Sequence, residues 1–349
     1  MKHGIRFLSL LLCLAVLAGC LTGVTAAQEG TEATILFTHD LHSHFLPAVD
    51  EDGGEYGGYA RLMPAIRRQR AIAPNAILVD GGDLAMGSLF QTAYPTAALE
   101  LRLMGAMGYD ATTFGNHEYD YLSSGLCEML YAAIDSGDPV PSILEANFLP
   151  PEDAADVWAA YEAYGVEPYM LLERCGVVYA IIGLSGYDCR DCAPRSGMIL
   201  EEPAVAAQRT VDEAVAAAKA QFDREPVVVC LSHSGTEGGM GEDYELAQAV
   251  TGIDLIISGH SHSTHSEPLV VGDTWIVSAG CYGKNLGVVK LSVSGDDVAF
   301  TGYELIPIDE TVADDPEIAA LVEQYKTEVE NGYLANYGMT FDQVLVVNP

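Results

Sequence analysis

Residues 111–120 read ATTFGNHEYD, and this stretch decides the fold that the sequence predicts. Its apolar part, residues 111–114, has the length and composition of a buried β-strand. Directly after it, in Gly115 to Glu118, a glycine that lets the chain turn precedes Asn, His and Glu. A strand that delivers polar side chains to a loop at its carboxyl end is typical of sites in α/β proteins.

Four other segments repeat this pattern. Each is a short apolar run that is followed within three residues by Asp or His. The four segments are Thr34 to His42, Ile77 to Asp83, Val227 to His233 and Ile253 to His262. A single His after a strand is usually structural. Five such segments in one chain instead predict that the strand ends meet at one rim and form a two-metal site. Imidazole, carboxylate and amide groups without thiolates favour zinc, manganese or iron.

Helix-patterned stretches separate these strands. The clearest cover residues 58–70, 96–107, 205–222 and 316–329. Their alternation with strands predicts a layered α/β architecture in which helices cover the sheets. Later apolar runs leave no room for helices between them, so we expect additional antiparallel strands at residues 269–271, 274–277, 288–293 and 298–305.

The composition is that of a strongly acidic globular protein. Hydrophobic residues make up 49% of the chain, and the formal charge of −34 is spread along it rather than concentrated in one tail. We therefore expect no nucleic-acid-binding face. A phosphate-containing substrate remains compatible with this charge, because bound divalent cations reverse the potential inside a site.

The start of the chain has the pattern of an export signal. Lys2 and Arg6 precede an apolar run, residues 7–18, that is shorter than a membrane-spanning helix needs. The sequence Leu17 to Cys20 resembles the cleavage box of bacterial lipoproteins. We therefore predict a signal over residues 1–19, a lipid on Cys20 that attaches the protein to a membrane, and a tether over residues 20–32.

The alternative is cleavage near Val24 to Ala26, which would give a freely secreted or periplasmic protein. Both interpretations place the folded part outside the cytoplasm, where disulfides are permitted. Cys189 and Cys192 have the spacing of half a zinc knuckle, but no second pair accompanies them, so we favour a local disulfide or free thiols. Cys230 lies in an apolar run and is interpreted as a buried small hydrophobe.

Together the five segments resemble the calcineurin-like metallophosphoesterases, and within them the bacterial 5′-nucleotidase and UDP-sugar hydrolase group. The resemblance runs from about Thr34 to Leu305 and includes all five motifs in order. It implies a four-layer α/β/β/α sandwich with two mixed sheets, which we assign to residues 33–308. It also implies a metal-dependent phosphoric ester hydrolase that binds two divalent metal ions.

Carried over position by position, the resemblance assigns the site residues. The first metal would be held by Asp40, His42, Asp83 and His262, and the second by Asp83, Asn116, His233 and His260. His117 and Asp120 would be the catalytic pair, in which His117 faces the phosphate and Asp120 orients its ring. The implied reaction is in-line attack on phosphorus by water that the metals activate, without a covalent phosphoenzyme.

Several polar side chains near these motifs have no assigned role. His39 stands where the nucleotidase group usually has Asn. His39, His44 and His265 either tune the ligands through hydrogen bonds or are plain loop histidines, and we favour the second interpretation. Glu118 is either a general base or a solvated loop carboxylate.

The C-terminal part departs from the family more strongly. In the family a linking helix and a nucleoside-binding domain follow the metal domain, whereas residues 309–349 provide only a candidate linking helix and a tail. We therefore expect the nucleoside-binding domain to be absent, or a partner chain to supply it. Three tyrosines offer a stacking face, although each is more readily explained as a packing residue: Tyr119, Tyr187 and Tyr282.

The leading prediction is an enzyme that hydrolyses 5′-nucleotides or related small phosphate esters. An alternative keeps the metals and changes the substrate, as in a cyclic-nucleotide phosphodiesterase, a nucleotide-sugar hydrolase or a thiosulfohydrolase-like enzyme. A further alternative is a non-catalytic exported metal-binding domain. The presence of His117 and Asp120 argues against it, because metal binding alone requires neither residue.

Overall fold

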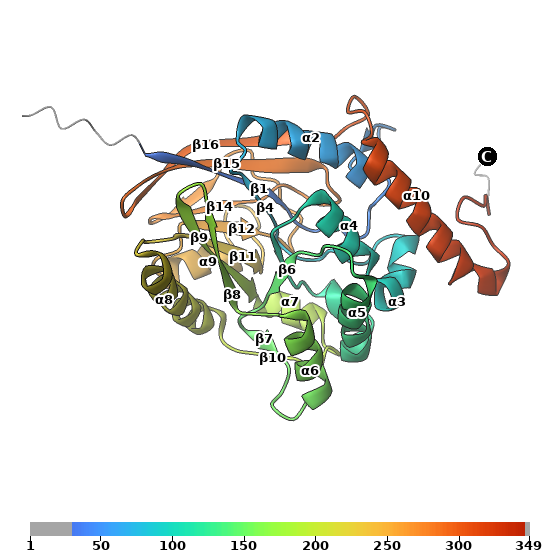
Figure 1. The fold of residues 1–349 in the computed structure, drawn as a ribbon, viewed down its shortest axis with the longest axis horizontal. Helices are drawn as coiled ribbons and strands as arrows, with labels where there is room; N and C mark the ends of the chain where they lie inside the picture. The colour runs from blue at the N-terminus through green and yellow to red at the C-terminus, as the bar shows by residue number, and fades with distance from the viewer. Residues whose placement is uncertain (1–29, 346–349) are drawn as a thin grey trace, which may run out of the picture.

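The computed structural model describes residues 30–345. Two six-stranded sheets pack face to face, and helices cover the outer face of each sheet (Figure 1). Both sheets combine parallel and antiparallel strands. The four-layer α/β/β/α sandwich expected from the sequence is therefore confirmed.

The first sheet has the strand order β16-β15-β1-β4-β5-β6. The bounds in chain order are β1 (Thr31–Thr38), β4 (Ile77–Asp80), β5 (Ala111–Thr113), β6 (Ser142–Leu144), β15 (Asn285–Ser294) and β16 (Asp297–Pro307). The pairs from β1 through β6 are parallel, and β15 and β16 add an antiparallel edge. The carboxyl ends of β1, β4 and β5 therefore lie at the same edge of the sheet.

The second sheet has the order β13-β14-β12-β11-β9-β8. Its strands are β8 (Tyr169–Arg174), β9 (Val177–Ser185), β11 (Val227–His233), β12 (Leu255–Ser258), β13 (Leu269–Val271) and β14 (Thr274–Val277). The four central strands are parallel, and the edge strands β8 and β13 are antiparallel to their neighbours. The four late strands predicted from the sequence are present, and they form two antiparallel pairs, one in each sheet.

The central strands are buried on both faces, which explains their continuous apolar sequences. In β1, Ile35 and Phe37 face the layer between the sheets, whereas Leu36 packs with the helices. In β11, Val229 faces the layer between the sheets and Cys230 packs beneath the helices of the second sheet. The interpretation of Cys230 as a buried hydrophobe is confirmed.

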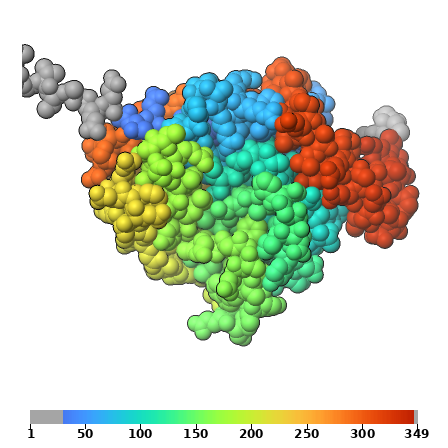
Figure 2. Space-filling model, viewed as in Figure 1, coloured from blue at the N-terminus to red at the C-terminus, as the bar shows by residue number. Residues whose placement is uncertain are grey.

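The helices form the two outer layers. On the first sheet lie α2 (Tyr59–Ile72), α3 (Tyr94–Ala97), α4 (Leu99–Met107), α5 (Leu122–Ser136), α6 (Ala155–Tyr164) and α10 (Pro316–Asn331). The second sheet is covered by α8 (Pro203–Phe222) and α9 (Glu242–Ala249), and a short helix, α7 (Tyr187–Cys192), follows β9. Figure 2 shows the C-terminal residues, drawn in red, lying against the blue and teal surface of the N-terminal part.

Two differences from the sequence prediction concern helices. The helix predicted over residues 96–107 is divided, because Ala98 has a left-handed backbone (φ 47°) that separates α3 from α4. Helices α5, α6 and α9 were not among those predicted. Helix α5 carries Gly125 and two serines in its first turns, and α6 and α9 are only ten and eight residues long. The remaining elements are short: β2 (Ala48–Val49), β3 (Glu55–Tyr56), β7 (Phe148–Leu149), β10 (Ile199–Leu200), η1 (Leu89–Ala93), η2 (His117–Tyr119) and η3 (Leu334–Tyr337).

The predicted C-terminal helix is α10, and local signals fix where it begins. Asp315 accepts hydrogen bonds from the backbone N–H groups of Glu317 and Ile318, and Pro316 occupies the first turn. One apolar face contacts the helical layer of the first sheet through Ile318, Val322, Tyr325 and Val329. The helix is thus part of the core of the first sheet.

The N-terminal boundary differs slightly from the prediction. Thr31 and Glu32, assigned to the tether, belong to β1 and pair with Val293 and Ser292 of β15. The predicted export signal and Cys20 lie outside the described residues. Within residues 30–345, none of the helices has the length and apolar character needed to cross a bilayer.

Candidate metal centre

Five strand ends meet at one rim where the two sheets adjoin. Loops after β1, β4 and β5 carry Asp40, His42, Asp83 and Asn116, and β11 and the loop after β12 carry His233, His260 and His262. Hydrogen bonds join the two sides: Nδ1 of His233 donates to the Gly81 carbonyl at 2.8 Å, and the His260 backbone N–H donates to Asp40 Oδ2 at 3.0 Å. The sequence correctly predicted that these segments meet.

The first group of side chains is Asp40, His42 and His262. Oδ1 of Asp40 lies 3.3 Å from Nε2 of His262 and 3.7 Å from Nε2 of His42. The two histidine Nε2 atoms are 2.9 Å apart. Each residue offers one ligand atom within 4.8 Å of the others, a spacing that suits a shared cation.

The second group is Asp83, His233 and His260, whose ligand atoms also lie within 4.8 Å of one another. Oδ2 of Asp83 is 3.1 Å from Nε2 of His233 and 3.7 Å from Nε2 of His42. Asp83 therefore lies between the two groups. Asn116 is adjacent to His117, whose backbone N–H donates to Oδ1 of Asp83 at 2.9 Å.

The chemistry of these donors fits divalent cations. Nδ1 of His42 donates to the Ala85 carbonyl at 3.2 Å, and Nδ1 of His233 donates to Gly81, so Nε2 of each ring is left to bind a cation. Nε2 of His233 and Oδ1 of Asn116 are buried and have no hydrogen-bond partner among the described residues. A bound cation would satisfy both atoms.

Five of the seven predicted ligands have a left-handed backbone: Asp40 (φ 51°), His42 (φ 48°), Asp83 (φ 54°), His260 (φ 71°) and His262 (φ 54°). This region is uncommon for residues with a Cβ atom, and each such residue carries a cost of about 1–3 kcal/mol. The surrounding sheets must supply that energy. Concentration of backbone strain in one rim is typical of a functional site.

Two glycines allow the loops to approach so closely. A Cβ atom on Gly115 would lie 2.2 Å from Oδ1 of Asp83, and one on Gly259 would lie 2.6 Å from the Gly81 carbonyl oxygen. Neither glycine has a positive φ, so close approach rather than turning explains them. Gly82, at φ 90°, does have a positive φ, a conformation that glycine adopts readily and that lets the chain turn before Asp83.

His117 and Asp120 form a pair at the edge of the rim. Nδ1 of His117 lies 2.9 Å from Oδ2 of Asp120, and both side chains are partly exposed. Burial lowers the pKa of His117, but the hydrogen bond to Asp120 and the charge of Asp83 outweigh it and raise that pKa. One His117 nitrogen also lies within 4.8 Å of ligand atoms of His42 and Asp83, so the pair faces the site.

The charged groups of the rim shift one another's pKa values. Burial raises the pKa of Asp40, but hydrogen bonds from His262, His39 and His42 outweigh it and hold that pKa well below its usual range. Burial lowers the pKa of His233, but Asp83 raises it to about 10. The hydrogen bond to Asp40 likewise raises the pKa of His262 to about 10. The same two carboxylates, Asp40 and Asp83, that hold protons on these imidazoles would also attract divalent cations.

Comparison with known proteins agrees with this geometry. The calcineurin-like phosphoesterase family profile matches residues 33–264, well over half of the sequence. The chain belongs to this family. It is similar to the trifunctional nucleotide phosphoesterase protein YfkN of Bacillus subtilis, with 31% identity over 86% of this chain and 21% of that protein. It is also similar to the human 5′-nucleotidase, with 28% identity over 90% of this chain and 56% of the human protein.

A solved structure shows the same fold. The 5′-nucleotidase precursor from Thermus thermophilus superposes with a TM-score of 0.71 and 24% identity over 86% of this chain and 59% of that one. This calcineurin-like phosphoesterase chain therefore spans about a fifth of the Bacillus protein and about half of the human one. Membership of the family implies divalent metal ions.

The three histidines without an assigned role, His39, His44 and His265, make different contacts in this calcineurin-like phosphoesterase. His39 is buried and contacts Asp40, so its interpretation as a plain loop histidine is wrong. His44 bonds the backbone carbonyl of His42 at 2.9 Å and stacks on Tyr282 with ring centroids 4.1 Å apart. His265 bonds Thr236 Oγ1 at 3.0 Å and none of the predicted ligands.

Glu118 is not a solvated carboxylate, because it is fully buried. Its oxygens accept the backbone N–H groups of Gly115 (2.6 Å), Asp83 (3.1 Å) and Ala85 (3.0 Å). Burial and the charge of Asp83 raise the pKa of Glu118 to about 8, against these hydrogen bonds. Through these hydrogen bonds Glu118 connects the turn that carries Asp83 with the turn that carries Asn116. Its role is therefore structural, and it does not act as a general base.

Asp188, which lies beyond the carboxyl end of β9, was not predicted from the sequence. Its Oδ2 is 2.8 Å from Nε2 of His260. The sequence signal was weak, because Gly186 and Tyr187 stand between the end of β9 and Asp188. Cys189 and Cys192 are both free, Cys189 buried and Cys192 exposed, so the local disulfide is wrong and the free thiols are correct.

Proposed function

We propose that this chain is a phosphate ester hydrolase whose rim holds two divalent cations, zinc, manganese or iron. Asp40, His42, Asp83 and His262 would hold the first cation, and Asp83, Asn116, His233 and His260 the second. The observation that supports this most is the position of Asp83 between Nε2 of His42 and Nε2 of His233. A shared carboxylate is what a two-metal site requires.

Cations bound here would supply Lewis-acid activation of water and of the phosphoryl oxygens. The chain's own contribution is a fixed proton donor. Asp120 occupies Nδ1 of His117, so Nε2 is the ring atom left to contact a substrate. The raised pKa of His117 favours its protonated form, which stabilises negative charge on a phosphoryl group or a leaving oxygen.

We propose 5′-nucleotides and related small phosphate esters as substrates. The nucleotide activities in the relatives' names support this class, although this chain spans only part of their length. Of the three tyrosines considered, Tyr119 is buried and serves packing. Tyr282 instead lies beside the rim, with its ring centroid 5.5 Å from those of His42 and His262. We propose it as a contact for the substrate's leaving group, with any further nucleoside contacts supplied by a partner chain.

The test is hydrolysis by the metal-loaded protein of p-nitrophenyl phosphate, bis-p-nitrophenyl phosphate, AMP, UDP-glucose and a cyclic nucleotide. We expect turnover of p-nitrophenyl phosphate and AMP. We expect little discrimination among AMP, GMP, CMP and UMP, because a stacking contact such as that of Tyr282 suits every base, whereas base selection needs a specific pocket. A preference above about 100-fold for one base would show a built nucleoside site. A protein that binds two cations and hydrolyses none of these esters would contradict the proposal.

We also propose that the chain acts outside the cytoplasm as a lipoprotein modified at Cys20. The basic start, the apolar run and the Leu17 to Cys20 sequence support it. Fatty-acid labelling of the protein in a bacterial host tests this, and Cys20→Ala should abolish the label. Labelling that survives the substitution would contradict lipidation at that residue.

A further inference from the structure

A second cluster of metal-ligating side chains lies beside the rim, on α7 and the loop after β12. Asp188 and Cys192 are four residues apart on α7, so they project from the same side of one helical turn. His260 faces them, with Nε2 2.8 Å from Oδ2 of Asp188. A carboxylate oxygen, a thiol sulfur and an imidazole nitrogen thus lie within 4.8 Å of one another.

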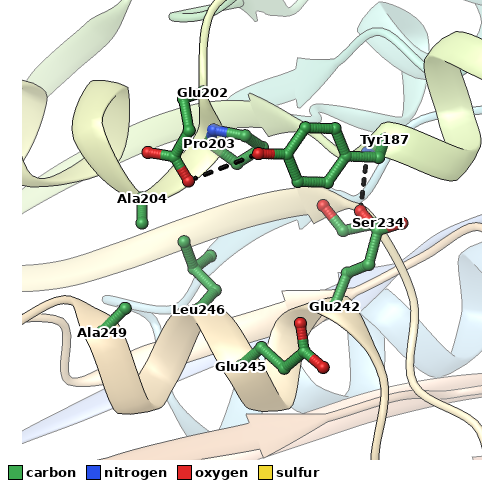
Figure 3. A pocket seen from close by; sticks show the side chains of 9 residues that line it. All are labelled: Tyr187, Glu202, Pro203, Ala204, Ser234, Glu242, Glu245, Leu246 and Ala249. Atoms are coloured by element: carbon green, nitrogen blue, oxygen red, sulfur yellow. Dashed lines mark hydrogen bonds between the residues drawn. The ribbon is translucent and has the colours of Figure 1, made fainter.

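The position of α7 is fixed by a contact with α9. Glu242 accepts the backbone N–H of Tyr187 at 2.6 Å and that of Asp188 at 3.0 Å. Figure 3 shows the first of these bonds, together with the contact of the Tyr187 hydroxyl with Glu202. Because both carboxylate oxygens of Glu242 are engaged in this way, Asp188 is held in place before any ligand binds.

The donor set differs from that of the two-metal centre. The seven centre residues offer imidazole, carboxylate and amide groups, whereas this cluster adds a thiol. Cys192 is free and exposed, so its sulfur is accessible to a metal ion from solvent. Cysteine, histidine and aspartate are the ligands of tetrahedral zinc, and three of them leave one coordination position open.

We propose that Asp188, Cys192 and His260 form a zinc site beside the two-metal centre, with which it shares His260. Zinc there would replace the hydrogen bond between His260 and Asp188, with the displaced protons released to solvent. His260 also belongs to the group with Asp83 and His233. Occupation of the rim site therefore engages a ligand of the centre, and excess zinc inhibits the enzyme. The inhibition rests on the proposed function, but the binding does not.

Cobalt substitution tests the binding without reference to activity. Protein whose centre is loaded with Mn²⁺ is titrated with Co²⁺, because thiolate coordination gives an intense near-ultraviolet charge-transfer absorption that nitrogen and oxygen ligands do not give. We expect the band to appear and to saturate in the wild type. Cys175→Ser, which removes another exposed free cysteine, should keep the band, and Cys192→Ser should lose it. Absence of the band from the wild type, or its retention in Cys192→Ser, would overturn the site.

Inhibition is measured separately as the zinc concentration that halves p-nitrophenyl phosphate hydrolysis, normalised to each variant without added zinc. Loss of one of three ligands should raise this concentration at least about tenfold in Cys192→Ser, whereas Cys175→Ser should match the wild type. Equal sensitivity in Cys192→Ser would overturn the link between the site and inhibition. If no ester is hydrolysed at all, the proposed function fails, and the cobalt band still decides whether the site exists.

Discussion

Nδ1 of His39 lies 2.5 Å from Oδ2 of Asp40, and both side chains are buried. The backbone N–H of Ala279 donates to Nε2 of His39 at 2.7 Å, so the imidazole proton is on Nδ1 and points at the carboxylate. Oδ1 of Asp40 is then the oxygen that faces His262. His39 therefore positions a predicted metal ligand and connects it to the segment after β14.

Replacing His39 should weaken metal binding without removing a ligand. His39→Phe keeps the ring shape and removes the hydrogen bond, so we expect metal affinity to fall about 10- to 100-fold, the range for loss of a ligand's hydrogen-bond partner. Competition with a chelator measures this affinity. His265→Phe is the matched control, because His265 contacts none of the predicted ligands. Unchanged affinity in His39→Phe would contradict the positioning role.

His117→Ala should retain the fold and the bound metals but lose about 10²- to 10⁴-fold in kcat, the contribution of a positioned proton donor. Asp120→Asn should fall between this variant and the wild type, because it weakens the orientation of the His117 ring without removing it. Steady-state kinetics and metal analysis check both. Since a His117 nitrogen lies near His42 and Asp83, loss of metal from His117→Ala would instead make His117 a ligand.

Glu118→Gln should destabilise the protein by about 1–3 kcal/mol, because one carboxylate oxygen becomes an amide group that cannot accept a backbone N–H. Oε2 of Glu118 accepts the backbone N–H groups of Gly115 and Asp83, and Oε1 accepts that of Ala85, so the amide loses at least one of these three bonds. Urea unfolding of the metal-free protein measures the free energy of unfolding. If the Glu118 carboxylate were solvated, Glu118→Gln would leave the free energy of unfolding unchanged. That result would contradict the structural role.

The metal-free protein should lose stability as the pH rises from about 6.5 to about 10. The pKa values of His233 and His262 are raised to about 10 in the folded state, above the value of about 6.5 in the unfolded chain. Their contribution is therefore fully present below pH 6.5 and is lost as the pH rises through the folded pKa. Thermal unfolding across this range checks it. Metal-loaded protein should not show this loss, and a Tm that rises in the metal-free protein would contradict it.

Much of the site was predictable from the sequence because the candidate metal ligands follow the ends of strands. The apolar run before Asp40 fixes β1, and parallel neighbours bring successive strand ends to one edge, so the sequence order of motifs becomes a spatial cluster. The five left-handed backbones were not predictable, because only tertiary packing selects that conformation for Asp and His. The burial of Glu118 was missed for the same reason.

Other features depend on contacts between distant residues. The hydrogen bond between Ala279 and His39 joins positions 240 residues apart. The division of α3 from α4 occurs at Ala98, where no glycine or proline indicates a break in the helix. Asp188 was missed because Gly186 and Tyr187 separate it from the end of β9, and its partner His260 is 72 residues away. For His39 and Asp188, the contact that gives the side chain its role is with a residue far away in the sequence.

The number of metal ions bound per chain tests the central claim most directly. Asp83 lies between both groups of ligands, so one substitution should affect both cations. We expect the wild type and Asp120→Asn to contain close to two transition-metal ions per chain, and folded Asp83→Ala to lose more than one of them. An Asp83→Ala protein that folds normally and keeps two ions would contradict the account.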